Sequence, residues 1–374
     1  MVIIKSFKDP IMVAKAFLPP IDEYKHKIEQ IWESNWLTNC GVLHNEFEEK
    51  LSRYLHVANS TLFSNGHLAL EAAIKALELT GEVITTPFTF ASTTHALVNC
   101  GLTPVFCDID LETCTIDATK LEALITEKTS AVLPVHVFGY PCDVYAIERV
   151  AKKYGLKVIY DAAHVFGVEV GGRGIGTFGD VTMFSLHATK VFHSIEGGIL
   201  TYDNNLLTRE FHLLRNFGIT GPDVVESPGI NAKMNEFQAA MGLVNLPYID
   251  EEIAKRRTIA LAYRAGLRAI PGIIYLEDNP GVKHNYSYFP IVVQEEEYGL
   301  TRNAVHEKLQ SYNIFTRKYF YPLTIDYPCY RGKFPGKLTN ARYIAERVLT
   351  LPMYGQLTLA DVNTICEIIK EIRN

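Results

Sequence analysis

Short apolar runs alternate with amphipathic stretches between about residues 60 and 200. The apolar runs VITTPFTF, PVFCDID, SAVLPVHVFG, LKVIYDAA and DVTMFSL predict strands. The stretches STTHALVNCG, 118–127 and VYAIERVAKKYG have helical spacing, and the first and third end in a glycine that stops a helix. Because the strands are apolar on both faces, the pattern predicts an α/β fold with a mostly parallel sheet flanked by helices. Ligands of such a sheet bind beyond the carboxyl ends of its strands.

The pattern changes after FHLLRNFGI. A polar loop, TGPDVVESPG, precedes a long helical stretch that is broken near Pro247. Beyond it, HNYSYFPIVV predicts a strand, and VHEKLQSYN and ARYIAERVLTLP predict helices. We therefore expect two domains: residues 1–250 form a large α/β domain with an N-terminal arm, and residues 251–374 form a small C-terminal α+β domain.

Composition narrows the class of function. The 374 residues are 48% hydrophobic, enough for a sizeable core, and the formal net charge of -6 comes from interspersed acids and bases. No basic stripe suggests nucleic acid, and no apolar run approaches the roughly 20 residues of a membrane span. The seven cysteines are scattered and include no C-x-x-C pair, which indicates free thiols in the cytoplasm and no metal site. We expect a small-molecule ligand.

One phosphate-binding motif fails on its context. GIGTFG, residues 174–179, matches G-x-G-x-x-G, but that fingerprint requires a helix after the glycines. The following segment DVTMFSL predicts a strand instead. We interpret these glycines as turn formers.

The segment FSLHATKVFHSIEGG places a lone lysine, Lys190, near the end of a predicted core strand. Lysine is costly to bury unless it is paired or used, and its obvious chemical use here is a Schiff base with a carbonyl. An enzyme that uses pyridoxal 5'-phosphate (PLP) also needs an acid for the pyridine nitrogen, a flat group against the ring and donors for the phosphate.

Candidates for each role lie at other strand ends. Asp161 directly follows the strand in VIYDAAH, 29 residues before Lys190. FSNGHLALEAAIKAL begins an amphipathic helix at Gly66, where free backbone amides favour an anion, and Ser185 offers a hydroxyl. Phe88 and Phe90 follow another strand and could cover the ring.

Each candidate also has an ordinary structural interpretation. Asp161 could cap a helix or form a turn, Lys190 could be a partly exposed surface residue, and Phe90 could belong to the core. The helix start at Gly66 could be a simple turn. The order of the four and their shared position at strand ends favour one common site.

Several segments together resemble the DegT/DnrJ/StrS sugar aminotransferases, a branch of the fold type I PLP-dependent enzymes. They are SNWLTNCGVLHNEFEEKLSRYL, GEVITTPFTFAST, PVFCDID, PVHVFGYPCD, DAAHVFG, SLHATKVFHSIEGG, GINAKMNEFQAAMGLVNL and FYPL. The resemblance covers nearly the whole chain. It implies a fold type I aminotransferase fold, with PLP bound by the large domain.

The resemblance also assigns roles to residues. Lys190 is the lysine that binds PLP covalently, and Asp161 pairs with the pyridine nitrogen. The remaining cofactor positions are Gly66, His67 and Ser185 at the phosphate, Phe90 and Ala163 on the two ring faces, His164 near the phenolic oxygen, and Asn231, which reaches the neighbouring subunit's phosphate. The active unit is therefore expected to be a homodimer with shared active sites.

Three positions depart from the family pattern, and one of them, His56 in place of a common glycine, is expected to be peripheral. Position 67 is usually threonine, whose hydroxyl would bind phosphate, so a role for the His67 side chain is open. Position 164 is often glutamine, and a ring nitrogen of His164 could make the same contact.

The substrate follows from the resemblance alone. HATK followed by EGG resembles the branch that aminates C4 of nucleotide-linked 4-keto-6-deoxy sugars. This implies L-glutamate as donor, 2-oxoglutarate as by-product and dTDP-4-keto-6-deoxy-D-glucose as acceptor, giving dTDP-4-amino-4,6-dideoxy-D-glucose for O-antigen, lipopolysaccharide or another surface glycan. Lys233, Arg317 and Tyr321 are the substrate-binding candidates.

Other readings stay open. The product could carry an axial amine, the nucleotide could be UDP or GDP, or amination could occur at C3. A non-catalytic regulator on the same fold would be expected to lack Lys190 or Asp161, and a PLP-dependent dehydratase would carry histidine in place of Lys190; this chain retains both residues.

Overall fold

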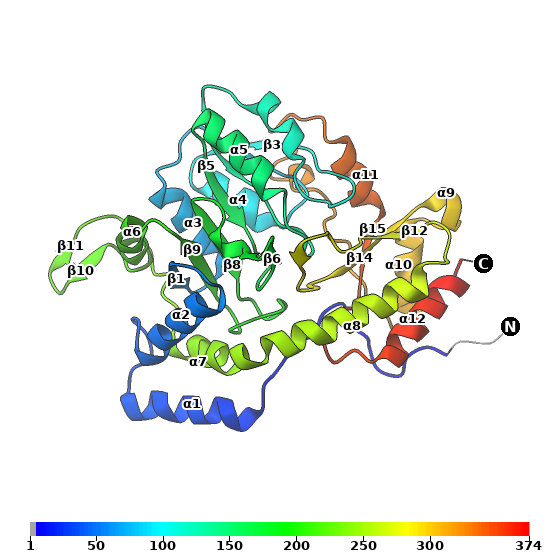
Figure 1. Cartoon of the computed structure of the whole chain (residues 1–374), viewed down its shortest axis with the longest axis horizontal. Coiled ribbons are helices and arrows are strands. Elements are labelled where there is room, and N and C mark those ends of the chain that lie inside the picture. The colour runs from blue at the N-terminus through cyan, green and yellow to red at the C-terminus, as the bar shows by residue number, and fades with distance from the viewer. Residues whose placement is uncertain (1–4, 374) are drawn as a thin grey trace.

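A seven-stranded sheet forms the centre of the molecule in the computed structural model, which describes residues 5–373 (Figure 1). Its strands, in spatial order, are β1 (Asn59–Phe63), β9 (Gly198–Tyr202), β8 (Val181–Ser185), β5 (Lys157–Asp161), β4 (Thr129–Leu133), β2 (Glu82–Thr85) and β3 (Thr103–Phe106). Neighbours from β8 to β3 run parallel, and β9 is antiparallel to both β8 and β1. The α/β fold with a mostly parallel sheet is confirmed.

Successive apolar side chains of the strands point to opposite faces of this sheet and form a hydrophobic core on each face. On β4, Ala131 and Leu133 enter one core and Val132 the other; on β8, Met183 and Phe184 divide in the same way. Successive strand residues point to opposite faces, so a strand that is apolar throughout must be covered on both sides.

Helices supply the two covers. The first face carries α3 (Gly66–Ala76), α4 (Ala91–Asn99) and α6 (Leu206–Arg215), and the second carries α2 (Val42–Tyr54), α5 (Val144–Tyr154) and α7 (Glu236–Asn245). Helix α1 (Ile21–Ser34) lies along α7. Asn65 caps α3 by accepting from the amide of Leu68, and Gly155 ends α5 in the left-handed conformation that suits glycine.

A second, smaller unit lies at the far end of α8 (Ile249–Leu267), which crosses the molecule (Figure 1). Its sheet contains β12 (Ile273–Tyr275), β14 (Phe289–Val293) and β15 (Val348–Leu351), and its helices are α9 (Glu295–Tyr298), α10 (Arg302–Ser311), α11 (Thr339–Arg347) and α12 (Leu359–Glu371). A third core fills this unit. The amides of Phe7 and Ile11 bond to carbonyls of Tyr312 and Asn313, so the N-terminal arm lies against it. The division near residue 250 remains our proposal.

Short elements complete the chain. A small sheet combines β6 (Glu169–Val170), β7 (Arg173–Gly174) and β13 (Val282–Lys283). The 3₁₀ segment η3 (Ile175–Thr177) and Gly179, at φ 76°, confirm that GIGTFG forms turns before a strand. The 3₁₀ segment η4 (Leu246–Tyr248) separates α7 from α8 and confirms the break near Pro247, while η5 (Thr324–Asp326) lies in the small unit.

Three local predictions were wrong. Residues 118–127 form two 3₁₀ turns, η1 (Ala118–Lys120) and η2 (Glu122–Leu124), because Asp117 caps the first and Leu124 is followed by extended backbone. The expected loop TGPDVVESPG contains the hairpin of β10 (Ile219–Gly221) and β11 (Val224–Val225). In ARYIAERVLTLP the helix ends at Arg347, because VLTL pairs with β14 as strand β15.

The described residues contain no helix that is long and apolar enough to cross a membrane. All seven cysteines are free thiols, in agreement with the prediction from their spacing.

Helices α2 and α7 meet at Gly242, and this contact yields a stability prediction. A Cβ atom there would lie 2.1 Å from Cζ of Phe47, which is fully buried. We expect Gly242→Ala to lower the free energy of unfolding by about 1–3 kcal/mol through overpacking, measured by urea denaturation. Gly221→Ala, whose nearest contact is 4.0 Å away, is the control and should change it by less than about 0.5 kcal/mol. Equal effects would contradict the close packing.

Candidate active site

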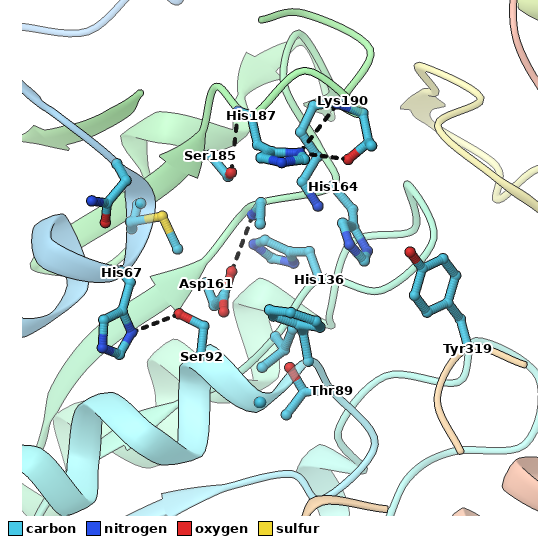
Figure 2. Close-up of a pocket in the computed structure, with 18 of the residues that line it drawn as sticks. His67, Thr89, Ser92, His136, Asp161, His164, Ser185, His187, Lys190 and Tyr319 are labelled. Carbon is cyan, nitrogen blue, oxygen red and sulfur yellow. Dashed lines mark hydrogen bonds between the residues drawn. The ribbon is translucent and has the colours of Figure 1, made fainter. Parts of the chain in front are cut away.

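The carboxyl ends of β5 and β8 and the N-termini of α3 and α4 open onto one cavity of about 860 Å³ (Figure 2). This position is the one expected for a ligand of a parallel sheet. Nine of the residues predicted from the sequence line it: Gly66, His67, Phe90, Asp161, Ala163, His164, Ser185, Lys190 and Arg317.

Asp161 is the last residue of β5, and its carboxylate is buried. Its main-chain amide bonds to the carbonyl of Pro134, which fixes the strand end. Oδ2 accepts from the hydroxyl of Thr93 at 2.8 Å. Oδ1 accepts from the amide of Ala163 at 3.1 Å, the bond drawn at Asp161 in Figure 2. Burial raises the pKa of Asp161, while these two donors and the charge of Lys190 oppose the rise. A cation placed beside this carboxylate would therefore be strongly favoured.

Lys190 lies in the loop after β8, where its amide bonds to the carbonyl of His187 at 2.9 Å. Its Nζ lies 6.0 Å from the ring centroid of Tyr288, and no carboxylate of the described residues lies within ion-pair distance of it. Burial lowers the pKa of Lys190, and the charge of Asp161 offsets part of that effect. The amine is thus more easily deprotonated, and hence more nucleophilic, than a surface lysine.

The two phenylalanines of PFTF, Phe88 and Phe90, differ in burial. Phe88 is fully buried, whereas Phe90 stands before α4 with 56% of its surface exposed and lines the cavity. Across the cavity lining, Ala163 presents only a methyl group. A large aromatic side chain is left exposed at a site where a flat ligand could stack on it.

His164 is held in one tautomer. Its Nδ1 accepts from the amide of Phe138 at 3.2 Å, and its ring lies parallel to that of Phe320. Burial holds the pKa of His164 well below its ordinary value, so the ring is neutral. Because Nδ1 is an acceptor, the proton is on Nε2, which makes His164 a hydrogen-bond donor at its free nitrogen.

The first turn of α3 is an anion site. The amides of Gly66 and His67 have no hydrogen-bond partner among residues 5–373, as expected for helix positions N1 and N2. A Cβ at position 66 would lie 3.0 Å from Sδ of Met183 and 3.3 Å from Cβ of Ser185, so any larger residue would require these neighbours on β8 to shift. The exposed amides and the helix dipole together favour a phosphate here.

Three predicted residues do not line the cavity of their own chain. Asn231 is exposed and accepts from Nζ of Lys233 at 3.0 Å. Tyr321 is half-exposed and packs against the guanidinium of Arg302. Tyr319, two residues earlier, lines the cavity instead, with the Arg317 guanidinium 4.6 Å from its ring centroid.

Other residues of the site were not predicted from the sequence. Thr93 is not part of the cavity lining, but it donates to Asp161 from behind it, and its position one helical turn beyond Phe90 on α4 could have suggested that role. Tyr288 and Tyr319 belong to the small unit and carry no local signal. His136, fully buried beside Tyr160, has its pKa lowered to about 3 by burial.

The groups in the cavity fit PLP. The uncompensated buried carboxylate suits a protonated pyridine nitrogen, the lone amine suits the aldehyde carbon, and the open face of Phe90 suits the ring. The free amides of α3 suit the phosphate.

Comparison with known proteins agrees with the fit of the cavity to PLP. The profile of the DegT/DnrJ/EryC1/StrS aminotransferase family matches residues 21–370. The dTDP-4-amino-4,6-dideoxy-D-glucose transaminase of Escherichia coli is 42% identical over 363 residues, covering 96% of this chain and 98% of the relative. The crystal structure of DesI in the presence of its TDP-sugar product has a TM-score of 0.95 at 35% identity, covering 99% of this chain and 94% of the other. A PLP form of a sugar aminotransferase, Spr1654 from Streptococcus pneumoniae, has a TM-score of 0.90 at 25% identity and covers 97% and 98% of the two chains.

The different burial of Phe88 and Phe90 yields a paired prediction. Phe88→Ala removes a buried ring and should lower the free energy of unfolding by about 3–5 kcal/mol. Phe90→Ala should change it by less than about 0.5 kcal/mol in the cofactor-free protein, yet should weaken PLP binding several-fold because the stacking surface is lost. Urea denaturation and a fluorescence titration with PLP measure the two effects. Unchanged PLP affinity in Phe90→Ala would contradict the stacking role.

Proposed function

The chain belongs to the DegT/DnrJ/EryC1/StrS aminotransferase family, and we propose that it transfers the amino group of L-glutamate to C4 of a nucleotide-linked 4-keto-6-deoxy sugar. It is a PLP-dependent sugar aminotransferase. The observation that carries the proposal is the convergence of Lys190, Asp161 and the open amides of α3 on one cavity.

The proposed acceptor is dTDP-4-keto-6-deoxy-D-glucose, and the product is dTDP-4-amino-4,6-dideoxy-D-glucose. The 42% identity to a transaminase of that product supports the choice of sugar. The DesI structure with its TDP-sugar product supports the thymidine nucleotide. Product analysis decides between an equatorial and an axial amine.

Asp161 sets the electronic environment of the cofactor. When bound, PLP supplies an electron sink and carries the amino group between the two substrates. In our proposal the ionised carboxylate of Asp161 holds a proton on the pyridine nitrogen by opposite charge. Thr93 and Ala163 keep that carboxylate in place and favour its charged form, because both donate to it.

Lys190 acts as the base and acid of both half-reactions in this proposal. Its lowered pKa leaves the amine free to accept a proton from the donor substrate and to return it to the acceptor. His164, neutral and protonated on Nε2, would donate a hydrogen bond to the phenolic oxygen of PLP. Phe90 and Ala163 would hold the ring between them.

The sugar nucleotide requires positive charge and hydroxyl groups for its diphosphate. Arg317 lines the cavity and is our first candidate for that contact. Lys233 and Tyr321 are retained as candidates from the family resemblance. Because Asn231 and Lys233 lie outside their own chain's cavity, we propose that they complete the site of a second subunit in a homodimer.

We also propose that the enzyme works in the cytoplasm. Free cysteines throughout the chain are typical of the reducing cytoplasm. We propose that the amino sugar is destined for O-antigen or another surface glycan.

The decisive experiment combines the protein with PLP, L-glutamate and dTDP-4-keto-6-deoxy-D-glucose. We expect 2-oxoglutarate and an amino sugar whose amine is on C4, located by NMR. Lys190→Ala should lose the absorbance band of covalently bound PLP and should lose turnover by at least about a thousandfold, because the base is removed. Lys75→Ala, at an exposed position of α3, is the control. An amine on C3, or full turnover in Lys190→Ala, would refute the assignment.

Asp161→Asn tests the role of the carboxylate separately. The amide has the same shape but no charge, so we expect PLP to bind while kcat falls by at least about a hundredfold. Absorbance titration measures binding, and single-turnover kinetics measure the chemical step. A kcat within threefold of the wild-type value would contradict this role.

A further inference from the structure

His67 stands where the family pattern has threonine, and it is the centre of a chain of polar contacts. Its Nε2 lies 3.2 Å from Oε1 of Glu71, one turn along α3. Its Nδ1 lies 2.9 Å from Oγ of Ser92 in the first turn of α4 (Figure 2). Glu71 is anchored in turn by Asn99, whose Nδ2 donates to the same oxygen at 2.9 Å. These contacts therefore join the largely buried carboxylate of Glu71 to a hydroxyl at the cavity.

The carboxylate fixes one ring nitrogen. An ionised carboxylate only accepts hydrogen bonds, so Nε2 of His67 must carry a proton when it faces Glu71. The protonation state of Nδ1 then decides what Ser92 can do. In neutral His67, Nδ1 accepts the hydroxyl hydrogen of Ser92 and turns it away from the cavity. In protonated His67, Nδ1 donates to Oγ, and the hydroxyl hydrogen is free to point into the cavity.

The cavity favours an anion at this position. Ser92 and His67 both line it, beside the free amides of α3. The amide of Ser92 also lacks a partner among residues 5–373, so two helix N-termini face the same space. The lysine and arginine of the described cavity lining, Lys190 and Arg317, have other roles in the proposed function.

Other titratable groups line the cavity as well. After β8, His187 lies 3.4 Å from Glu196 and next to the hydroxyl of Ser185. On α4, His95 faces His67, and burial, followed by the charge of His67, lowers the pKa of His95. Strand β8 contributes Met183 and Ser185, which are uncharged. Glu71 is the acid on its own helix, with Oε1 3.2 Å from Nε2 of His67.

We propose that His67 takes up a proton when a phosphate monoester occupies the cavity, and that Ser92 then donates its hydroxyl hydrogen to that phosphate. The proton comes from solvent, and no covalent bond changes. His67 and Ser92 are positioning residues for the phosphate, and Glu71 acts through His67. The inference rests on the proposed function, because it places the cofactor phosphate at the N-terminus of α3.

The coupling of phosphate binding to proton uptake determines how the phosphate affinity depends on pH. The bound state holds one more proton than the free state, so phosphate affinity falls as the pH rises. The slope reaches at most about tenfold per pH unit, the limit for uptake of one proton. A threonine at position 67 supplies a hydroxyl donor without a proton, so His67→Thr should bind with a much weaker pH dependence.

Calorimetry of the full-length cofactor-free protein with pyridoxine 5'-phosphate tests this inference. The probe has no aldehyde and cannot condense with Lys190. Titrations between about pH 6 and about pH 8.5, where histidine titrates, in two buffers of different ionisation enthalpy give the number of protons taken up. We expect uptake of a large fraction of one proton by the wild type and a clear loss of it in His67→Thr and Glu71→Gln. His95→Gln, the matched control, should retain it.

Nitrogen-15 NMR of histidine-labelled protein provides a second readout. With the probe bound, both ring nitrogens of His67 should show protonated shifts, and without it only Nε2 should. Tight binding with equal proton uptake in wild type and His67→Thr would overturn the inference and leave the proposed function intact. Equal affinity for pyridoxine and its phosphate would overturn both the phosphate position and the inference.

Discussion

A buried carboxylate must be compensated, and that requirement organises the cavity around Asp161. Burial disfavours its charge, so the structure supplies a hydroxyl from α4 and an amide from its own loop. The sheet fixes the position of this carboxylate, because the amides of Asp161 and Ala162 bond to the carbonyls of Pro134 and Met183. The remaining imbalance is what a protonated pyridine nitrogen would remove. The order of the strands and the position of α4 thus determine the environment of the Asp161 carboxylate, and the cofactor complements its charge.

The same principle applies to two histidines of the cavity lining, His164 and His67. Each imidazole is given a neighbour that fixes one nitrogen: the Phe138 amide for His164, and Glu71 for His67. Burial keeps His164 neutral, so it offers one donor as an amide side chain would. Nε2 of His67 instead lies 3.2 Å from a carboxylate oxygen of Glu71. In both residues a neighbouring group thus fixes the role of one ring nitrogen.

Much of the fold followed from periodicity, and its failures have physical causes. Strands apolar on both faces predicted the central sheet and its two helical covers, because no other arrangement buries them. Residues 118–127 have helical spacing, yet Asp117 nucleates a tight turn that ends too soon for an α-helix. In ARYIAERVLTLP, pairing with β14 converts the end of an apparent helix into a strand. Propensity is local, whereas strand pairing depends on distant partners.

The sequence by itself determined the sheet and placed Lys190, Asp161 and the start of α3 near its carboxyl edge, because strand ends and helix caps are local signals. The sequence also showed that GIGTFG, residues 174–179, is not a dinucleotide-binding fingerprint, because a strand follows it. Only the tertiary structure brought Thr93 to Asp161, Tyr319 to the cavity and Ser92 to His67. These contacts join segments that are far apart in the chain or on different helices. Hydrogen-bond geometry and burial, which no periodic pattern encodes, decide them.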